Sequence, residues 1–179
     1  MRRLSMLSLV AVLVAVMAAP VSAKKPDPTE LPLMGEFSGR LIGFGAVEEG
    51  RCDATPEGKV AWAVTSFEGW GTATHLGKAY VYAEHCSYAD EVTGPDGTYG
   101  QGQFKIVAAN GDILYGTYTD GESLTPPPLV EFVDKFTFVN GGTGRFATAS
   151  GGGVEMGIAD LESGAANWQM EGVISYKRR

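Results

Sequence analysis

Asp134 is the residue of this chain whose neighbours best suit it to acid–base chemistry. Alternate residues of a strand share one face, so Asp134 shares a face with Phe132 and Phe136. A carboxyl group among aromatic rings loses hydration, which raises its pKa toward the range useful for proton transfer. The sequence therefore predicts Asp134 as a candidate catalytic acid or base if this face points inward. If the face points outward, Asp134 is an ordinary surface or paired carboxylate.

Arginine and aromatic side chains supply the candidate contacts to a ligand. Arg40 lies in the first predicted strand and would partner Asp134 if both side chains face inward. Aromatic residues of other strands would line a cavity, and tyrosines would add hydroxyl groups. The candidate ligand-binding residues are Arg40, Tyr115, Tyr118, Phe132, Phe136 and Trp168. The alternative is that all of them are surface or packing residues.

The chain carries none of the familiar motifs for nucleophilic catalysis or phosphate binding. No serine lies in a G-x-S-x-G elbow, and neither a phosphate-binding loop nor a dinucleotide fingerprint occurs. His75 and His85 are the only histidines, and their spacing relative to Glu84 is not that of a metal site. We therefore expect no metal and no cofactor.

Strands must position these side chains, because the sequence shows β-patterning throughout. Short runs rich in Val, Thr, Tyr and Phe are separated by many glycines. The predicted strands are 36–44, 59–67, 70–76, 78–86, 101–108, 112–119, 130–139, 153–160 and 167–176. The alternative for 70–76 and 78–86 is one long bent strand around Gly77. Loops are expected at 90–100 and 120–128, and Asn110-Gly111 predicts a hairpin with a two-residue type I′ turn.

This strand pattern favours one all-β domain folded as a closed antiparallel barrel of about eight strands. Closure removes the exposed edges that an open sheet would leave. A barrel of this size is either filled by side chains or holds one small ligand. A β-sandwich is the competing architecture.

The run Asn140-Gly141-Gly142-Thr143-Gly144-Arg145-Phe146-Ala147, with Gly151-Gly152-Gly153 after it, predicts a tight corner between two strands. One helical turn is expected at 145–150. Together with Phe136-Thr137-Phe138-Val139 before it, and with Ala149 and Gly151, the run resembles the corner motif of the allene oxide cyclase and dirigent barrel superfamily. Exported bacterial proteins carry similar Gly-Thr-Gly-Arg-Phe-Ala runs.

The resemblance implies an eight-stranded barrel, often with a central cavity for a hydrophobic small molecule. It also implies dimers or trimers, and in some members cyclisation or radical coupling of a bound substrate. The motif itself contains no acid, base or nucleophile, so it specifies a turn and not an activity.

Residues 1–23 have the features of a secretory signal peptide. Arg2 and Arg3 precede an apolar run, and Val21-Ser22-Ala23 forms a small-residue cleavage site. An uncleaved anchor is the alternative. We expect a flexible leader at 24–34, the barrel domain at 35–176 and a basic tail at 177–179. The protein would then be secreted or periplasmic.

The net charge of the chain limits the classes of partner that it can bind. The net charge of −7 includes both signal arginines, so the exported part would carry −9. Such an acidic protein has no electrostatic attraction to nucleic acid or, after signal cleavage, to anionic membranes.

Cys52 and Cys86 are the only cysteines and are expected to form a disulfide in an oxidising compartment. A metal or redox pair is the rival, but the two are not spaced as C-x-x-C.

The leading expectation is an exported barrel that binds a small hydrophobic or aromatic molecule without catalysis. One alternative is a cofactor-free enzyme of the cyclase or dirigent type that uses Asp134. Another is a purely structural or interaction domain, whose barrel would be filled by Trp62, Phe132, Phe136 and Trp168. An open cavity with converging polar groups would favour binding or catalysis.

Overall fold

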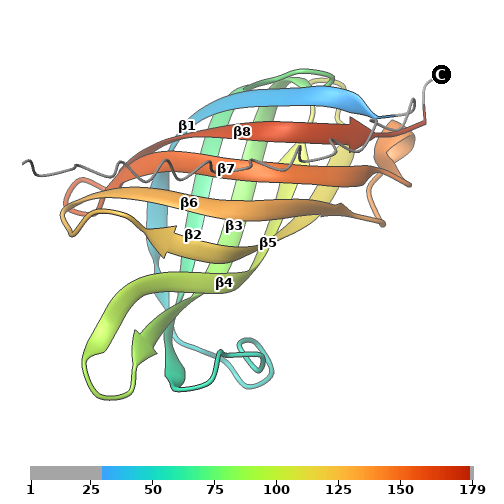
Figure 1. Ribbon diagram of the computed structural model, residues 1–179. Helices are drawn as coiled ribbons and strands as arrows, with labels where there is room; N and C mark the ends of the chain where they lie inside the picture. The colour runs from blue at the N-terminus through green and yellow to red at the C-terminus, as the bar shows by residue number, and fades with distance from the viewer. Residues whose placement is uncertain (1–29, 178–179) are drawn as a thin grey trace, which may run out of the picture.

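The chain folds into one closed β-barrel in the computed structural model, which describes residues 30–177 (Figure 1). Eight antiparallel strands pair with their neighbours in sequence order, and β8 closes the barrel on β1. The elements are β1 (Leu31–Gly45), β2 (Lys59–Ala73), β3 (Gly77–Asp90), β4 (Gly94–Val107), β5 (Ile113–Ser123), β6 (Leu129–Val139), η1 (Gly144–Phe146), β7 (Ser150–Asp160) and β8 (Ala165–Ser175). The predicted barrel is confirmed, and the β-sandwich is excluded.

Several predicted boundaries are wrong. The predicted strand 59–67 and residues 70–73 belong to one strand, β2, residues 74–76 form a turn, and 78–86 belongs to a separate strand, β3. The chain reverses between them at His75 and Gly77, whose φ angles are 67° and 70°. Most of the loop expected at 90–100 is strand, because only residues 91–93 separate β3 from β4. The barrel also begins at Leu31, inside the expected leader, whereas the expected signal at 1–23 lies outside the described residues.

The Asn110-Gly111 hairpin is in the predicted place but has a different turn. Gly111 N–H donates to the Ala108 carbonyl at 2.9 Å, and Val107 pairs with Ile113. Gly111 has a φ of 83° and Asn110 has no positive φ, so a type I′ turn is excluded. The arrangement is a turn followed by a left-handed glycine, which is typical of slightly longer hairpin loops.

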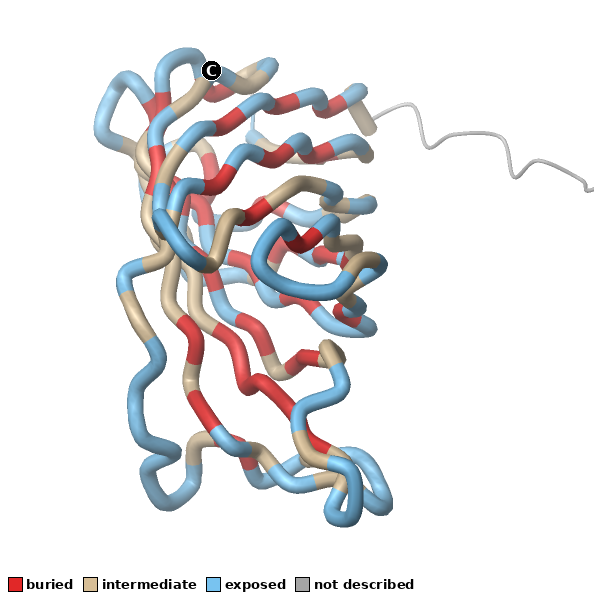
Figure 2. Tube along the Cα trace, turned by 90° about the vertical axis from the view of Figure 1, so that its left-hand side faces the viewer, coloured by how far each residue is buried: buried red, intermediate tan, exposed pale blue. Residues whose placement is uncertain are grey.

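Burial alternates along the strands, so one face of each strand forms the interior (Figure 2). On β6, Asp134 and Phe136 are buried, while Lys135 and Thr137 between them are exposed. The face that the sequence assigned to Asp134 therefore points into the barrel. Within residues 30–177 no helix is long and apolar enough to cross a membrane.

One end of the barrel is closed by packed side chains. The β2–β3, β4–β5 and β6–β7 connections lie at this end, and Phe146 of the glycine-rich corner is fully buried there. Phe146 belongs to one core cluster with Leu76, Leu114 and Ile174, which are also fully buried. The expected helical turn is a short 3₁₀ turn at Gly144–Phe146. The glycine-rich corner therefore supplies Phe146, whose side chain helps to close this end of the barrel.

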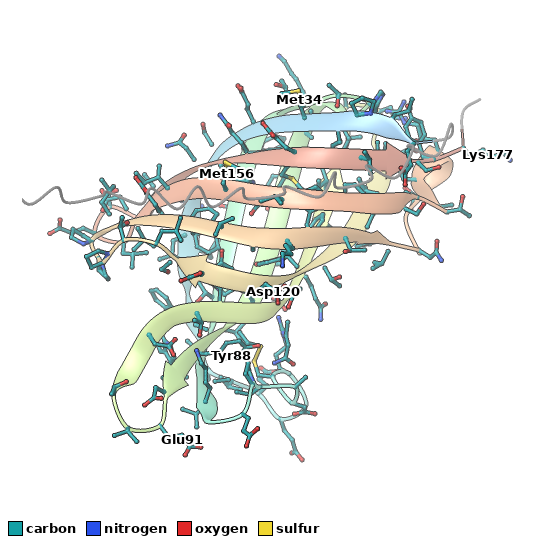
Figure 3. All side chains as sticks on the ribbon, viewed as in Figure 1. Met34, Tyr88, Glu91, Asp120, Met156 and Lys177 are labelled. Carbon is teal, nitrogen blue, oxygen red and sulfur yellow. A yellow bond between two sulfur atoms is a disulfide. The ribbon has the colours of Figure 1, made fainter. Side chains whose placement is uncertain are left out.

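The opposite end is flared. Register shifts occur there at Leu41/Gly43 of β1, Ala61/Ala63 of β2, Ser87/Ala89 of β3 and Thr119/Glu122 of β5. Such bulges bend strands and increase their twist. The ends of β2, β3 and β4 extend past the body of the barrel as a lobe (Figure 1). The predicted disulfide between Cys52 and Cys86 is confirmed and lies in this lobe, near the labelled Tyr88 (Figure 3).

Candidate functional site

The barrel encloses a cavity of about 600 Å³. Its mouth lies at the flared end and is lined by apolar side chains, among them Phe44, Trp62, Leu124, Pro126 and Pro127. The rings of Phe44 and Trp62 stack at 5.4 Å, and Trp62 Nε1 donates to the Tyr88 carbonyl at 3.1 Å. Phe44, Trp62 and Leu124 are all about half-exposed. The entrance is therefore mainly apolar, and the Phe44–Trp62 stacking and the Trp62–Tyr88 hydrogen bond hold it in place.

Two carboxyl groups face each other inside the cavity. Asp134 of β6 and Glu155 of β7 are direct partners in the β6–β7 register, and both line the cavity. We call them the carboxyl pair. Asp134 is only 2 % exposed, and its Oδ2 accepts a hydrogen bond from the Tyr99 hydroxyl at 3.0 Å. Its Oδ1 is buried without a partner in the protein.

Burial shifts both acids toward the protonated form. Loss of hydration raises the pKa of Asp134 to about 7, although the Tyr99 hydrogen bond lowers it in part. Burial raises the pKa of Glu155 well above its ordinary value, and the nearby Asp134 carboxylate raises it further. Two like charges on directly paired strand residues disfavour each other in a poorly hydrated interior. The carboxyl pair therefore holds its protons to a higher pH than ordinary carboxyl groups do.

A neutral aromatic cluster lies beside the carboxyl pair. His85 of β3 is 8 % exposed, and its Nδ1 shares a 3.0 Å hydrogen bond with the Tyr118 hydroxyl of β5. The His85 ring stacks on Tyr99 with ring centroids 4.3 Å apart. Burial, with a smaller effect of Arg51, lowers the pKa of His85 to about 3, so the imidazole is uncharged. Burial also raises the pKa of both tyrosines, which remain protonated.

Two glycines make room for the tyrosine rings. Tyr99 pairs across the β4–β5 ladder with Gly121, where an added Cβ would lie only 2.1 Å from the ring. Tyr118 pairs with Gly102 in the same ladder, where an added Cβ would lie 2.5 Å from the ring. Each ring thus lies over a neighbouring backbone that has no side chain. This close approach holds Tyr99 in reach of Asp134.

The structure brings some of the predicted residues together and separates others. Tyr118, Phe132, Phe136, Trp168 and Asp134 all line the cavity. Arg40 points outward and forms a 2.6 Å salt bridge with Glu68. It is therefore not the partner of Asp134, because its strand neighbour Gly39 occupies the inward position. Tyr115 lies on the outer face and is 36 % exposed.

Three important residues were missed by sequence reasoning. Glu155 falls in a predicted strand among Gly153 and Gly157, but its run lacks the aromatic neighbours that marked Asp134. The Gly and Pro residues around Tyr99 indicate a loop by composition. His85 stands in no motif that marks it as a site residue. The usable signal was the pairing of β6 with β7, which places Glu155 opposite Asp134.

The arrangement combines an apolar pocket with a few converging polar groups. Such a site can hold an apolar molecule, donate a proton from a neutral carboxyl group or neutralise a positive charge. In residues 30–177, no group of three His, Cys, Asp or Glu side chains is arranged to hold a metal ion.

Comparison with known proteins does not assign this chain to a family. No family model, curated protein or solved structure matches it.

Proposed function

We propose that the protein binds one small, largely apolar or aromatic molecule inside the barrel. The observation that carries this proposal is the cavity of about 600 Å³, which is mainly apolar and has converging polar groups at one internal site. Typical small-molecule pockets span about 300–1,000 Å³ and combine these two features. Trp168, Phe132 and Phe136 line the space without filling it, so the interior does not favour a purely structural role.

We also propose that the protein acts outside the cytoplasm, as a secreted or periplasmic protein. The support is the Cys52–Cys86 disulfide, because such bonds persist mainly in oxidising compartments. The signal-like sequence of residues 1–23 points the same way.

The binding proposal is tested by native mass spectrometry of protein purified from its own host. A retained small molecule should add a discrete mass, which should disappear in the variant Ala83→Trp. Ala83 of β3 lines the cavity, so a tryptophan there fills the space. The matched control is Ala165→Trp, because Ala165 is exposed on β8 and does not line the cavity. A mass that persists in Ala83→Trp would contradict binding inside the barrel.

A second candidate function is cofactor-free acid–base catalysis on the bound molecule, of the kind that the resemblance to cyclase and dirigent barrels implies. The specific observation in its favour is the carboxyl pair, since one buried acid can donate a proton while the other accepts one. The test is incubation of the retained molecule with wild-type protein and with Asp134→Asn. Conversion by wild type alone would support catalysis, and an unchanged molecule in both samples would exclude it for that ligand.

A further inference from the structure

The charges that line the cavity have one sign. The described residues of the lining include the acids Asp96, Asp134 and Glu155 but no lysine or arginine. Asp96 is at the mouth and is neutralised by Lys59, whose Nζ lies 2.7 Å from its Oδ2. An anionic ligand such as a carboxylate would therefore meet no positive charge inside. Burying an unpaired anion is costly, so the lining disfavours that ligand class.

The surroundings of the carboxyl pair contain no competing cation. Facing side chains come from β3, β4 and β5, and these are His85, Tyr99 and Tyr118, all uncharged near neutral pH. The β8 side chains in the lining are Trp168 and Met170. Arg51 of the β1–β2 loop does not line the cavity and is paired with Glu84 at 3.1 Å. The charge of the pair is thus unbalanced by the protein.

Asp134 also has an unused acceptor. Its Oδ1 is buried without a hydrogen-bond partner and belongs to a residue that lines the cavity. A buried acceptor without a donor costs free energy that a ligand N–H group would recover. Aromatic rings surround the same site, and ring faces attract cations as well as apolar groups. The site therefore favours a ligand that has a hydrogen-bond donor, a positive charge and an apolar body.

We propose that the ligand is a small lipophilic amine, bound as its ammonium ion with the carboxyl pair as its counter-charge. This inference rests on the proposed binding function and names its ligand class. The ammonium N–H groups would donate to Asp134 Oδ1 and to Glu155, and the apolar body would extend toward the mouth. The arriving cation brings its own proton and displaces a proton from the carboxyl pair to solvent. Binding therefore strengthens as pH rises through the range in which the free pair loses protons.

The test compares three probes that share a naphthalene body: 1-naphthylmethylamine, 1-naphthalenemethanol and 1-naphthoate. Calorimetric titration of the mature protein near neutral pH should show the amine binding at least about tenfold more tightly than the alcohol. The naphthoate should bind more weakly than the alcohol. The affinity for the amine should rise as pH increases toward about 7, where Asp134 ionises, and the affinity for the alcohol should not.

Variants separate the carboxyl pair from general surface charge. The double variant Asp134→Asn with Glu155→Gln should bring the amine and the alcohol to within about twofold of each other. The control Glu131→Gln removes an acid from the exposed face of the same strand and should keep the preference. The wild-type comparison and its pH profile need no variant, so they decide the question even if the double variant does not fold.

The outcomes distinguish this inference from the binding function beneath it. If the alcohol or the naphthoate binds wild type as tightly as the amine, the amine assignment is overturned and the binding function stands. If none of the three probes binds wild type, both proposals are overturned for ligands of this size.

Discussion

At the scale of single residues, the burial of Asp134 makes the stability of the protein depend on pH. The folded state holds this proton up to about pH 7, whereas an unfolded aspartate releases it near its ordinary pKa of 3.8. Between these values the folded state binds more protons, so the free energy of unfolding falls as pH rises. His85 acts oppositely, since its folded pKa of about 3 lies below its ordinary value of 6.5. Its contribution is lost as pH falls from 6.5 toward 3.

The variant Asp134→Asn isolates the carboxyl contribution. Asparagine cannot ionise, so the variant should gain stability relative to wild type as pH rises from about 4 to about 7, by on the order of 2–4 kcal/mol. Urea unfolding at a series of pH values measures the difference. Glu131→Gln, on the exposed face of β6, is the matched control. A stability difference that stays constant with pH would show that Asp134 titrates normally.

Tyr99 is the hydrogen-bonding partner that keeps the pKa of Asp134 from rising further. Replacing it by phenylalanine should therefore raise that pKa above the wild-type value and cost about 1 kcal/mol of stability. Carboxyl carbon chemical shifts, followed by NMR across the pH range, report the change directly. Tyr115→Phe, on the outer face, should leave the Asp134 titration as it is. An unchanged titration in Tyr99→Phe would contradict the role given to this hydroxyl.

Sequence reasoning reached Asp134 but not its partners, and the cause is physical. The position of Asp134 between Phe132 and Phe136 is a local pattern, visible from period-two alternation alone. Glu155, Tyr99 and His85 become neighbours only through strand pairing and ring stacking between residues far apart in sequence. Arg40 was a reasonable candidate because its direction depends on one residue of register.

At the scale of elements, the glycine-rich corner is predictable because its conformation is local. Gly144 has a φ of 54°, and an added Cβ would lie only 2.0 Å from Asp112 Oδ1. Any residue with a side chain at this position would therefore have a strained backbone and would clash with Asp112. The corner positions Phe146 at the closed end, so its geometry contributes to the core as well as to the turn.

Gly144→Val should destabilise the barrel by about 3 kcal/mol or more. The change would be seen as a lower urea midpoint with an unchanged slope. Gly43→Val in β1 is a suitable control, because that glycine has no positive φ and no atom within 4 Å of an added Cβ. Equal urea midpoints for Gly144→Val and Gly43→Val would show that Gly144 is not a strained position.

Strand ends at the flared side were predicted poorly for an equally physical reason. Glycine, proline and aspartate around residues 90–100 indicate a loop by composition, yet β3 and β4 pair through most of it. Bulges absorb the irregular residues, including Gln101 with its φ of 48°, without ending the strands. The hairpin at Asn110-Gly111 was located well because its signal does not depend on distant pairing.

At the scale of the whole molecule, the barrel is built with two different ends. The closed end is a packed core of aliphatic and aromatic side chains, and its cluster contains no cysteine. The flared end has a small separate cluster around Cys52, Cys86 and Tyr88, which holds the β1–β2 loop against β3. The disulfide therefore stabilises the end where the mouth residues Phe44 and Trp62 must be positioned.

Replacing both cysteines, as Cys52→Ala with Cys86→Ala, tests this division of the barrel. The bond closes a loop across a sequence separation of 34, so its loss should reduce the free energy of unfolding by about 3–4 kcal/mol. The β1–β2 loop, residues 46–58, should become the first site of limited proteolysis, while the closed end keeps its hydrogen-exchange protection. Binding of a cavity probe should weaken because the mouth is no longer held.

Reductant should lower the melting temperature of wild type and leave that of the double variant unchanged. Equal melting temperatures for wild type with and without reductant would show that the disulfide contributes nothing to stability, and uniform loss of protection would show that the two ends unfold as one unit.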